Sequence, residues 1–223
     1  MVEQLYRKQR VVGSSPIGGS KAISDWDCFF LYCMKKIIAN IFFKVSRWKI
    51  KIDGDSKSLD RCVLVVAPHT SNWDFILGIL TYWKLGKKLK IIIKDSHTKA
   101  FYGKIVEKMG GIGINRAQKN DLVNFVASAF EKEDFSLVIT PEGSRSWSPK
   151  WHLGFYYMAR KAEVPIVLAS GDYQKKEIQI GYTISVEKIE QEPLEVILVE
   201  IEDYFRNIQG KFPKNYNPQI YER

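Results

Sequence analysis

Short apolar runs alternate with amphipathic segments along this chain from residue 50 onward. The runs have the length and the valine and isoleucine content of strands, and the segments between them carry apolar residues at helical spacing. This alternation predicts an α/β fold with a mostly parallel central sheet flanked by helices. The expected strands are residues 50–53, 61–67, 90–94, 112–115, 136–140, 164–168 and 179–186, and the expected helices are residues 73–84, 99–109, 119–132, 153–162 and 193–209.

The length of the chain favours one such domain. A chain of 223 residues is long enough for one sizeable core and short for two. Its hydrophobic fraction of 45% argues for a packed protein rather than a disordered one. We expect the domain to occupy residues 50–210, followed by a C-terminal tail at 211–223. The Gly-, Ser- and Pro-containing residues 1–24 are expected to form a flexible N-terminal extension.

Residues 25–49 predict a separate amphipathic helix. Phe30, Met34, Ile37 and Ile41 fall at helical spacing, and lysines lie among them. Such a helix can dock on a membrane, with its aromatic face below the headgroups and its basic residues at their level. It can also pack on the protein core. The density of aromatic and basic residues favours docking, and no apolar run approaches the ~20 residues that span a bilayer.

The charge of the chain favours an anionic partner. Its 34 Lys and Arg residues against 25 Asp and Glu residues give a net charge of +9. Nucleic acid, an anionic membrane surface or a phosphorylated substrate would suit this charge. No nucleic-acid-binding motif and no long basic run accompanies it, so nucleic acid is not expected as a partner. The three cysteines form no Cys-x-x-Cys pair, which indicates free thiols in a reducing cytoplasm and no metal site.

A histidine and a carboxylate are delivered to one corner between a strand and a helix. The residues His-Thr-Ser-Asn-Trp-Asp at 69–74 join the strand 61–67 to the helix that starts near Trp73. His69 and Asp74 can meet only if His69 precedes the helix and Asp74 lies in its first turn, with Ser71 or Asn72 as the cap. Asp74 would then accept a hydrogen bond from one imidazole nitrogen, and the other nitrogen could take a proton from a substrate hydroxyl.

Two further loops follow strands of the same predicted sheet. The residues Pro-Glu-Gly-Ser-Arg-Ser at 141–146 follow the strand 136–140, and Arg116 follows the strand 112–115. Ligands bind along the carboxyl edge of open α/β sheets. Glu142 could hold its loop or bind a hydroxyl, and Arg145 offers a planar donor set for a phosphate. The three loops together predict a functional site at this edge.

These loops closely resemble the sequence blocks of the glycerolipid acyltransferases, specifically the 1-acylglycerol-3-phosphate acyltransferases. Residues 69–74 match the first block, 113–116 (Gly-Ile-Asn-Arg) the second, 141–146 the third and 164–167 (Val-Pro-Ile-Val) the fourth. Ser144 stands where the family more usually has threonine. The blocks occur in the family's order and cover most of residues 60–170. The resemblance implies an acyltransferase domain with an N-terminal membrane-docking helix.

The resemblance also implies a reaction and roles for residues. A fatty acyl group would pass from a thioester donor to the free hydroxyl of lysophosphatidic acid, with His69 as general base and Asp74 orienting it. Backbone amides near the corner could stabilise the oxyanion. The residues implied to bind the acceptor are Arg116, Glu142, Gly143, Ser144 and Arg145.

The implied setting is that of phospholipid biosynthesis. The donor would be acyl-CoA or acyl carrier protein as a co-substrate, with no bound cofactor and no metal. The protein would be peripheral on the cytoplasmic face of the inner or plasma membrane. Two alternatives stay open: the same chemistry on another lyso-lipid or lipid alcohol, and a non-catalytic peripheral membrane protein.

Overall fold

The computed structural model describes residues 25–94, 99–101, 103–108, 110–114 and 122–220. The chain divides into two compact units, Met1–Leu31 and Tyr32–Arg223. The sheet, both hydrophobic cores and the candidate site belong to the second unit. The predicted N-terminal extension at residues 1–24 and Arg116, which was expected to bind the acceptor, lie outside the described residues.

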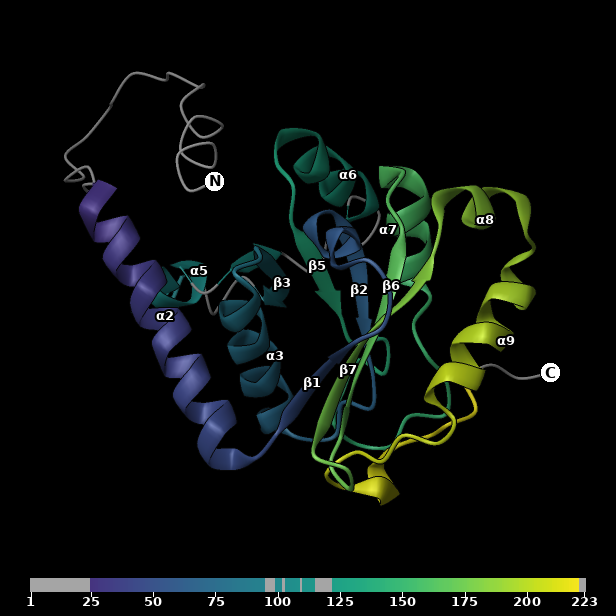
Figure 1. Cartoon of the computed structure of the whole chain (residues 1–223). Coiled ribbons are helices and arrows are strands. Elements are labelled where there is room, and N and C mark those ends of the chain that lie inside the picture. Colours follow the sequence, from purple (N-terminus) through teal and green to yellow (C-terminus); the bar gives the residue numbers. More distant parts are fainter. Residues whose placement is uncertain (1–24, 95–98, 102, 109, 115–121, 221–223) are drawn as a thin grey trace. The chain divides into compact units, whose positions relative to one another are not determined.

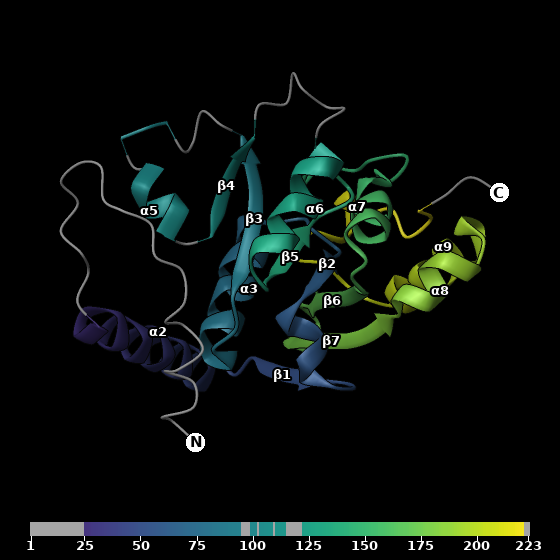
Figure 2. The same ribbon diagram turned by 90° about the horizontal axis from the view of Figure 1, so that it is seen from above.

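The second unit is built on one seven-stranded sheet (Figures 1 and 2). The strand order is β1-β7-β6-β2-β5-β3-β4. Strands β6, β2, β5, β3 and β4 are parallel to one another, β7 is antiparallel to β6, and β1 is parallel to β7. The predicted mostly parallel sheet is therefore confirmed. The strands are β1 Lys49–Ile52, β2 Cys62–Val66, β3 Leu89–Lys94, β4 Gly111–Ile114, β5 Ser136–Ile139, β6 Ile166–Asp172 and β7 Glu177–Ile184.

Helices connect and cover the strands. The α-helices are α2 Asp25–Ser46, α3 Asn72–Leu85, α5 Gly103–Lys108, α6 Leu122–Lys132, α7 Gly154–Ala162, α8 Val186–Gln191 and α9 Leu194–Phe205, and the short 3-10 helices are η1 Ser56–Asp60 and η3 Pro213–Asn215. Among the described residues, no helix combines the length and the apolar character that crossing a membrane requires.

The segment after β7 differs from its sequence prediction. One helix was expected at 193–209, but α8 precedes this segment and α9 ends at Phe205. The side chain of Ser185 starts α8 by accepting a hydrogen bond from Lys188 N. Glu192 ends it in an extended conformation, with φ −93° and ψ 145°. A residue before proline is disfavoured in the helical conformation, so Pro193 separates the two helices.

Both faces of the sheet are buried, and β2 shows how. Its side chains alternate between two hydrophobic cores: Val63 and Val65 face one, and Cys62 and Leu64 face the other. The first core lies under α6, α7 and α9, and contains Phe130, Phe155 and Phe205. The second contains Leu77 and Leu80 of α3 together with Ala39 and Phe43 of α2. Strands that are apolar on both faces are the pattern expected for a parallel sheet between helical layers.

The site depends on the pairing of β2 with β5 and β6. All three strands run in the same direction, and Val65 is paired with both Ile139 and Leu168. The chain segments that follow these strands therefore leave the sheet at one edge. They are residues 67–71 after β2, residues 140–146 after β5, and Tyr173 after β6.

Candidate active site

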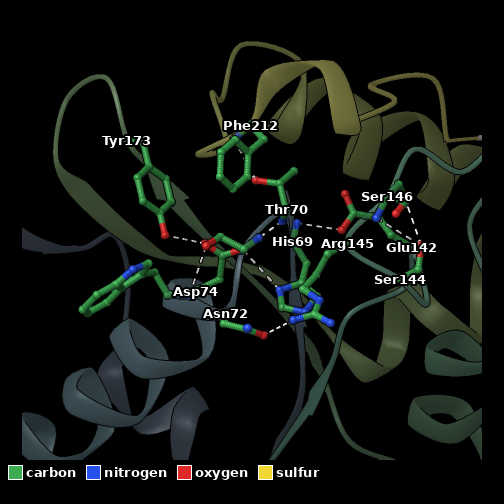
Figure 3. A network of polar contacts seen from close by, with 12 residues as sticks. His69, Thr70, Asn72, Asp74, Glu142, Ser144, Arg145, Ser146, Tyr173 and Phe212 are labelled. Carbon is green, nitrogen blue, oxygen red and sulfur yellow. Dashed lines mark hydrogen bonds and ion pairs between the residues drawn. The ribbon is translucent and has the colours of Figure 1, made fainter.

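The corner between β2 and α3 brings His69 and Asp74 together as the sequence predicts (Figure 3). His69 lies outside the helix, and Asp74 is the third residue of α3. Ser71 is the N-cap, with its side chain accepting a hydrogen bond from Trp73 N. His69 Nδ1 lies 3.2 Å from Asp74 Oδ2. That contact is a close approach rather than a hydrogen bond, because Nδ1 has no partner of suitable hydrogen-bond geometry. Catalytic hydrogen bonds are often poorly aligned before substrate binds.

The carboxylate of Asp74 is held by three hydrogen bonds. Its Oδ2 accepts from Thr70 N and from Ser71 N, each at 2.9 Å. Its Oδ1 accepts from Tyr173 Oη at 2.5 Å. The contact with Ser71 completes a capping box, in which the cap and the third helical residue satisfy each other's backbone donors. The single carboxylate of Asp74 therefore binds the backbone of the loop, caps the start of α3 and faces His69.

The two side chains differ in their burial. The His69 side chain is 20% exposed and that of Asp74 is 7% exposed. A reacting hydroxyl can thus reach the imidazole, whereas the carboxylate is shielded from water. The outward nitrogen, Nε2, is the atom positioned to take a proton.

Several backbone amides of this corner are already in use. His69 N donates to Glu142 Oε2 and Trp73 N donates to Ser71 Oγ, while the amides of Thr70 and Ser71 serve Asp74. These four amides are not free for an oxyanion. The general expectation that amides near the corner stabilise the oxyanion therefore does not hold for them.

Glu142 supports the loop at residues 67–71, which carries His69 and is called the histidine loop below. It is buried, and its Oε2 accepts a hydrogen bond from His69 N at 2.6 Å. Burial raises the pKa of Glu142 from 4.5 to about 7, and the nearby Asp74 carboxylate adds to this, while the His69 backbone donor opposes it. The sequence left two roles open for Glu142, holding its own loop or binding a hydroxyl, and the structure shows it holding the neighbouring loop that carries His69. Its contact with an acceptor lipid stays a prediction.

Glu142 leads to a prediction about stability and pH. A carboxyl whose pKa is raised on folding favours the folded state below its unfolded pKa, near 4.5. That contribution falls as the pH rises through the folded pKa near 7, by up to about 3 kcal/mol. Glu142→Gln does not titrate and keeps an oxygen for His69 N, so we expect it to be more stable than the native protein at pH 8. The advantage should shrink at pH 5.

Urea unfolding of both proteins at pH 5 and pH 8 measures this difference directly. Every other titrating group is common to the two proteins, so the comparison isolates Glu142. An equal stability difference at both pH values would show that this carboxyl does not titrate between them.

The loop after β5 brings Arg145 to the same corner. The guanidinium of Arg145 contacts Asn72 Oδ1 at the start of α3, three residues from His69 (Figure 3). The Arg145 side chain is exposed. Ser144 Oγ is bonded within the loop, to the nitrogen and the oxygen of Ser146. The structure thus brings His69, Asp74, Glu142 and Arg145 together.

Gly143 is required by the shape of this loop. Its φ of 71° lies in the left-handed region, and a Cβ there would come within 2.8 Å of the His152 ring. Gly143 therefore shapes the backbone that positions its neighbours Glu142 and Arg145.

The sequence prediction missed Tyr173, which donates to Asp74. Strand β6 was expected to end at residue 168, and it continues to Asp172. Had the sequence predicted that this strand ends at Asp172, Tyr173 would have been the first residue after it, at the same edge of the sheet. The apolar run stops at Ala169. Ser170 and Gly171, which follow, do not have the apolar pattern that would predict a longer strand.

Comparisons with known proteins bear on the family and the fold of this chain. The model of the family described as "Acyltransferase" matches residues 49–169, more than half of the chain. The curated proteins contain no match. Among solved structures, the chain is similar to the crystal structure of the 1-acyl-sn-glycerophosphate (LPA) acyltransferase PlsC from Thermotoga maritima. The identity is 14% and the TM-score 0.54, over 90% of this chain and 83% of that one, a likeness that supports the fold.

Proposed function

The chain belongs to the acyltransferase family, and on that premise we propose that it transfers a fatty acyl group from a thioester donor to lysophosphatidic acid. The product is phosphatidic acid. The observation that carries this proposal is the contact of His69 with Asp74 beside Arg145, at one edge of the sheet. A base with its orienting carboxylate and an exposed guanidinium suit a hydroxyl acceptor that bears a phosphate.

The mechanism follows from the two nitrogens of His69. Nδ1 faces Asp74, which sets the orientation of the ring, and Nε2 takes the proton of the acceptor hydroxyl. The acceptor oxygen then attacks the thioester carbonyl carbon, and the carbon–sulfur bond breaks. The departing thiolate takes the proton back from His69. The donor is acyl-CoA or an acyl-carrier protein, and both are acidic molecules that suit a chain of charge +9.

Arg145 is the residue expected to recognise the phosphate. We expect Arg145→Gln to raise the KM for lysophosphatidic acid by about 10- to 100-fold, because a hydrogen bond to a charged group is lost. The KM for a monoacylglycerol, which lacks the phosphate, should stay unchanged. Steady-state kinetics with both acceptors makes the comparison.

The control for Arg145 is Arg160→Gln, which removes an exposed arginine from the last turn of α7. It should leave both KM values as they are. If Arg145→Gln raises the KM of both acceptors equally, the guanidinium does not read a phosphate, and another lyso-lipid or lipid alcohol becomes the better acceptor. Native protein that binds vesicles but acylates none of these acceptors would favour the non-catalytic alternative.

A membrane-docking role for α2 is part of the proposal. The buried Ala39 and Phe43 attach the helix to the second core. Other apolar side chains of α2 remain exposed to solvent, namely Tyr32, Met34, Ile37, Ile38, Ile41 and Val45. Lys36 and Lys44 lie among them and are exposed as well. An exposed apolar stripe with basic neighbours suits the cytoplasmic face of an anionic membrane, which would also supply the lipid acceptor.

Docking can be tested on α2 without disturbing the core. Ile37 and Ile41 are 51% and 58% exposed, so Ile37→Asp combined with Ile41→Asp should fold. We expect the pair to weaken binding to phosphatidylglycerol-containing vesicles by at least about tenfold, because two apolar groups no longer enter the interface. Vesicle sedimentation measures it. Phe125→Asp, at a site on α6 that is 45% exposed, is the control, and equal weakening by both would argue against α2 as the docking element.

A further inference from the structure

Tyr173 is fixed beside the candidate site by contacts from three directions. Its hydroxyl donates to Asp74 Oδ1 at 2.5 Å, and its backbone N donates to Gln209 O at 2.9 Å. Its ring meets Trp48 edge-on, with the centroids 5.0 Å apart and the planes at 84°. The orientation of the hydroxyl is therefore set by packing and by the backbone, and does not depend on Asp74 alone.

The two oxygens of Asp74 have different partners. Oδ2 accepts from two amides and faces His69 Nδ1, whereas Oδ1 accepts from the Tyr173 hydroxyl. Figure 3 shows Tyr173 and His69 on opposite sides of the carboxylate. A donor on Oδ1 opposes rotation of the carboxylate plane. It also withdraws charge from the group that attracts a protonated imidazole.

The segment that anchors Tyr173 also anchors the histidine loop. Gln209 O binds the backbone of Tyr173, and Phe212 N donates to Thr70 Oγ1 at 3.2 Å. Between them, Gly210 is buried so closely that a Cβ would lie 2.8 Å from Thr70 Oγ1. Tyr173 and residues 209–212 both lie beyond the matched region, which ends at residue 169. The site is thus supported by a part of the chain outside the family match.

We propose that Tyr173 is a positioning residue for acyl transfer: its hydroxyl fixes the Asp74 carboxylate and limits how strongly that carboxylate holds a protonated His69. The inference rests on the proposed function, in which His69 is the base. Tyr173 touches neither the acceptor nor the donor in this role. It acts through Asp74, and it keeps the imidazole oriented and free to return its proton.

Tyr173→Phe tests the hydroxyl alone. The variant keeps the ring, its contact with Trp48 and the backbone bond to Gln209. We expect kcat to fall about tenfold, because the base is less well oriented, with KM values unchanged. The acidic limb of the pH–rate profile should move up by about half a pH unit, because the carboxylate holds the protonated imidazole more tightly. The charged groups that the structure brings to this corner, Glu142 and Arg145, are the same in both proteins, as is Lys211, whose ammonium lies over the rings of Trp73 and Phe212.

The matched control is Tyr182→Phe. Tyr182 Oη also donates to a carboxylate, Glu200 Oε2 at 2.9 Å, but on the exposed surface of β7. Its loss should change neither kcat nor the pH profile. An acidic limb that stays in place in Tyr173→Phe, or that moves equally in the control, would overturn the proposal.

Failure of the proposed function is distinguishable from failure of this inference. If the native protein acylates none of the acceptors, NMR titration of the imidazole protons still compares the same variants without substrate. The His69 signal is assigned by its loss in His69→Ala, since the chain has three histidines. A titration midpoint that is higher in Tyr173→Phe than in the native protein and in Tyr182→Phe supports the positioning role, and an unmoved midpoint overturns it.

Discussion

His69→Ala is expected to lower the kcat of acyl transfer by about 10³-fold, because the acceptor hydroxyl loses its general base. The fold should be retained. The contact that ties this loop to Glu142 uses the backbone nitrogen of residue 69, which alanine keeps. The His69 side chain is also partly exposed and makes no well-aligned hydrogen bond, so its removal leaves little unsatisfied.

Kinetics of His69→Ala should therefore show that activity is lost, whereas thermal unfolding should show a melting temperature that is nearly unchanged. His152→Ala is the control. It removes the histidine that packs beside Gly143 in the neighbouring loop, and it should retain most of the activity. Undiminished turnover in His69→Ala would refute the assignment of the base.

Asp74→Ala is expected to remove activity and stability together. Removing the carboxylate leaves Thr70 N, Ser71 N and the Tyr173 hydroxyl without their acceptor, and the capping box of α3 is lost. A lost cap costs about 1 kcal/mol and unsatisfied buried donors cost about 1–3 kcal/mol. We therefore expect about 3 kcal/mol of destabilisation, or a fall of roughly 6–12 °C in the melting temperature. The kcat should fall by at least about 100-fold, because the imidazole is no longer oriented.

Asp74→Asn separates the two roles of this residue. The amide oxygen can replace one carboxylate oxygen in the capping box, so much of the stability should return. The negative charge that faces His69 is absent in this variant, so the activity should stay low. Differential scanning calorimetry and single-turnover kinetics on the two variants measure both quantities. Normal activity in Asp74→Asn would show that the charge of Asp74 does not assist His69.

Local patterns in the sequence account for much of this fold. Cys62 to Val66 are apolar without interruption, which correctly predicts a strand buried on both faces. Ser71 and Asp74, three residues apart ahead of an apolar run, form the capping box that starts α3. The prediction was less good where a local pattern was weak. Helix α8 has only six residues, and the polar end of β6 carries no apolar run.

The candidate site was predictable in part. His69, Asp74, Glu142 and Arg145 each follow a strand that the sequence identifies, and parallel strands place their carboxyl ends at one edge. The burial of Glu142 against the backbone of His69 could not be predicted from the sequence of its own loop. It depends on how the loops after β2 and β5 pack against each other. Arg116 lies outside the described residues, so its role stays a prediction.

The sequence by itself determined the alternation of strands and helices, the strand-to-helix corner of His69 and Asp74, and membership of an acyltransferase family. These features depend on residues close together in the chain, where spacing and capping act directly. Only the tertiary structure decided which groups hold Asp74 and His69. Tyr173 is 99 residues from Asp74, and Phe212 is 142 residues from Thr70. Contacts at such separations depend on the order of strands in the sheet, and no local spacing carries that information.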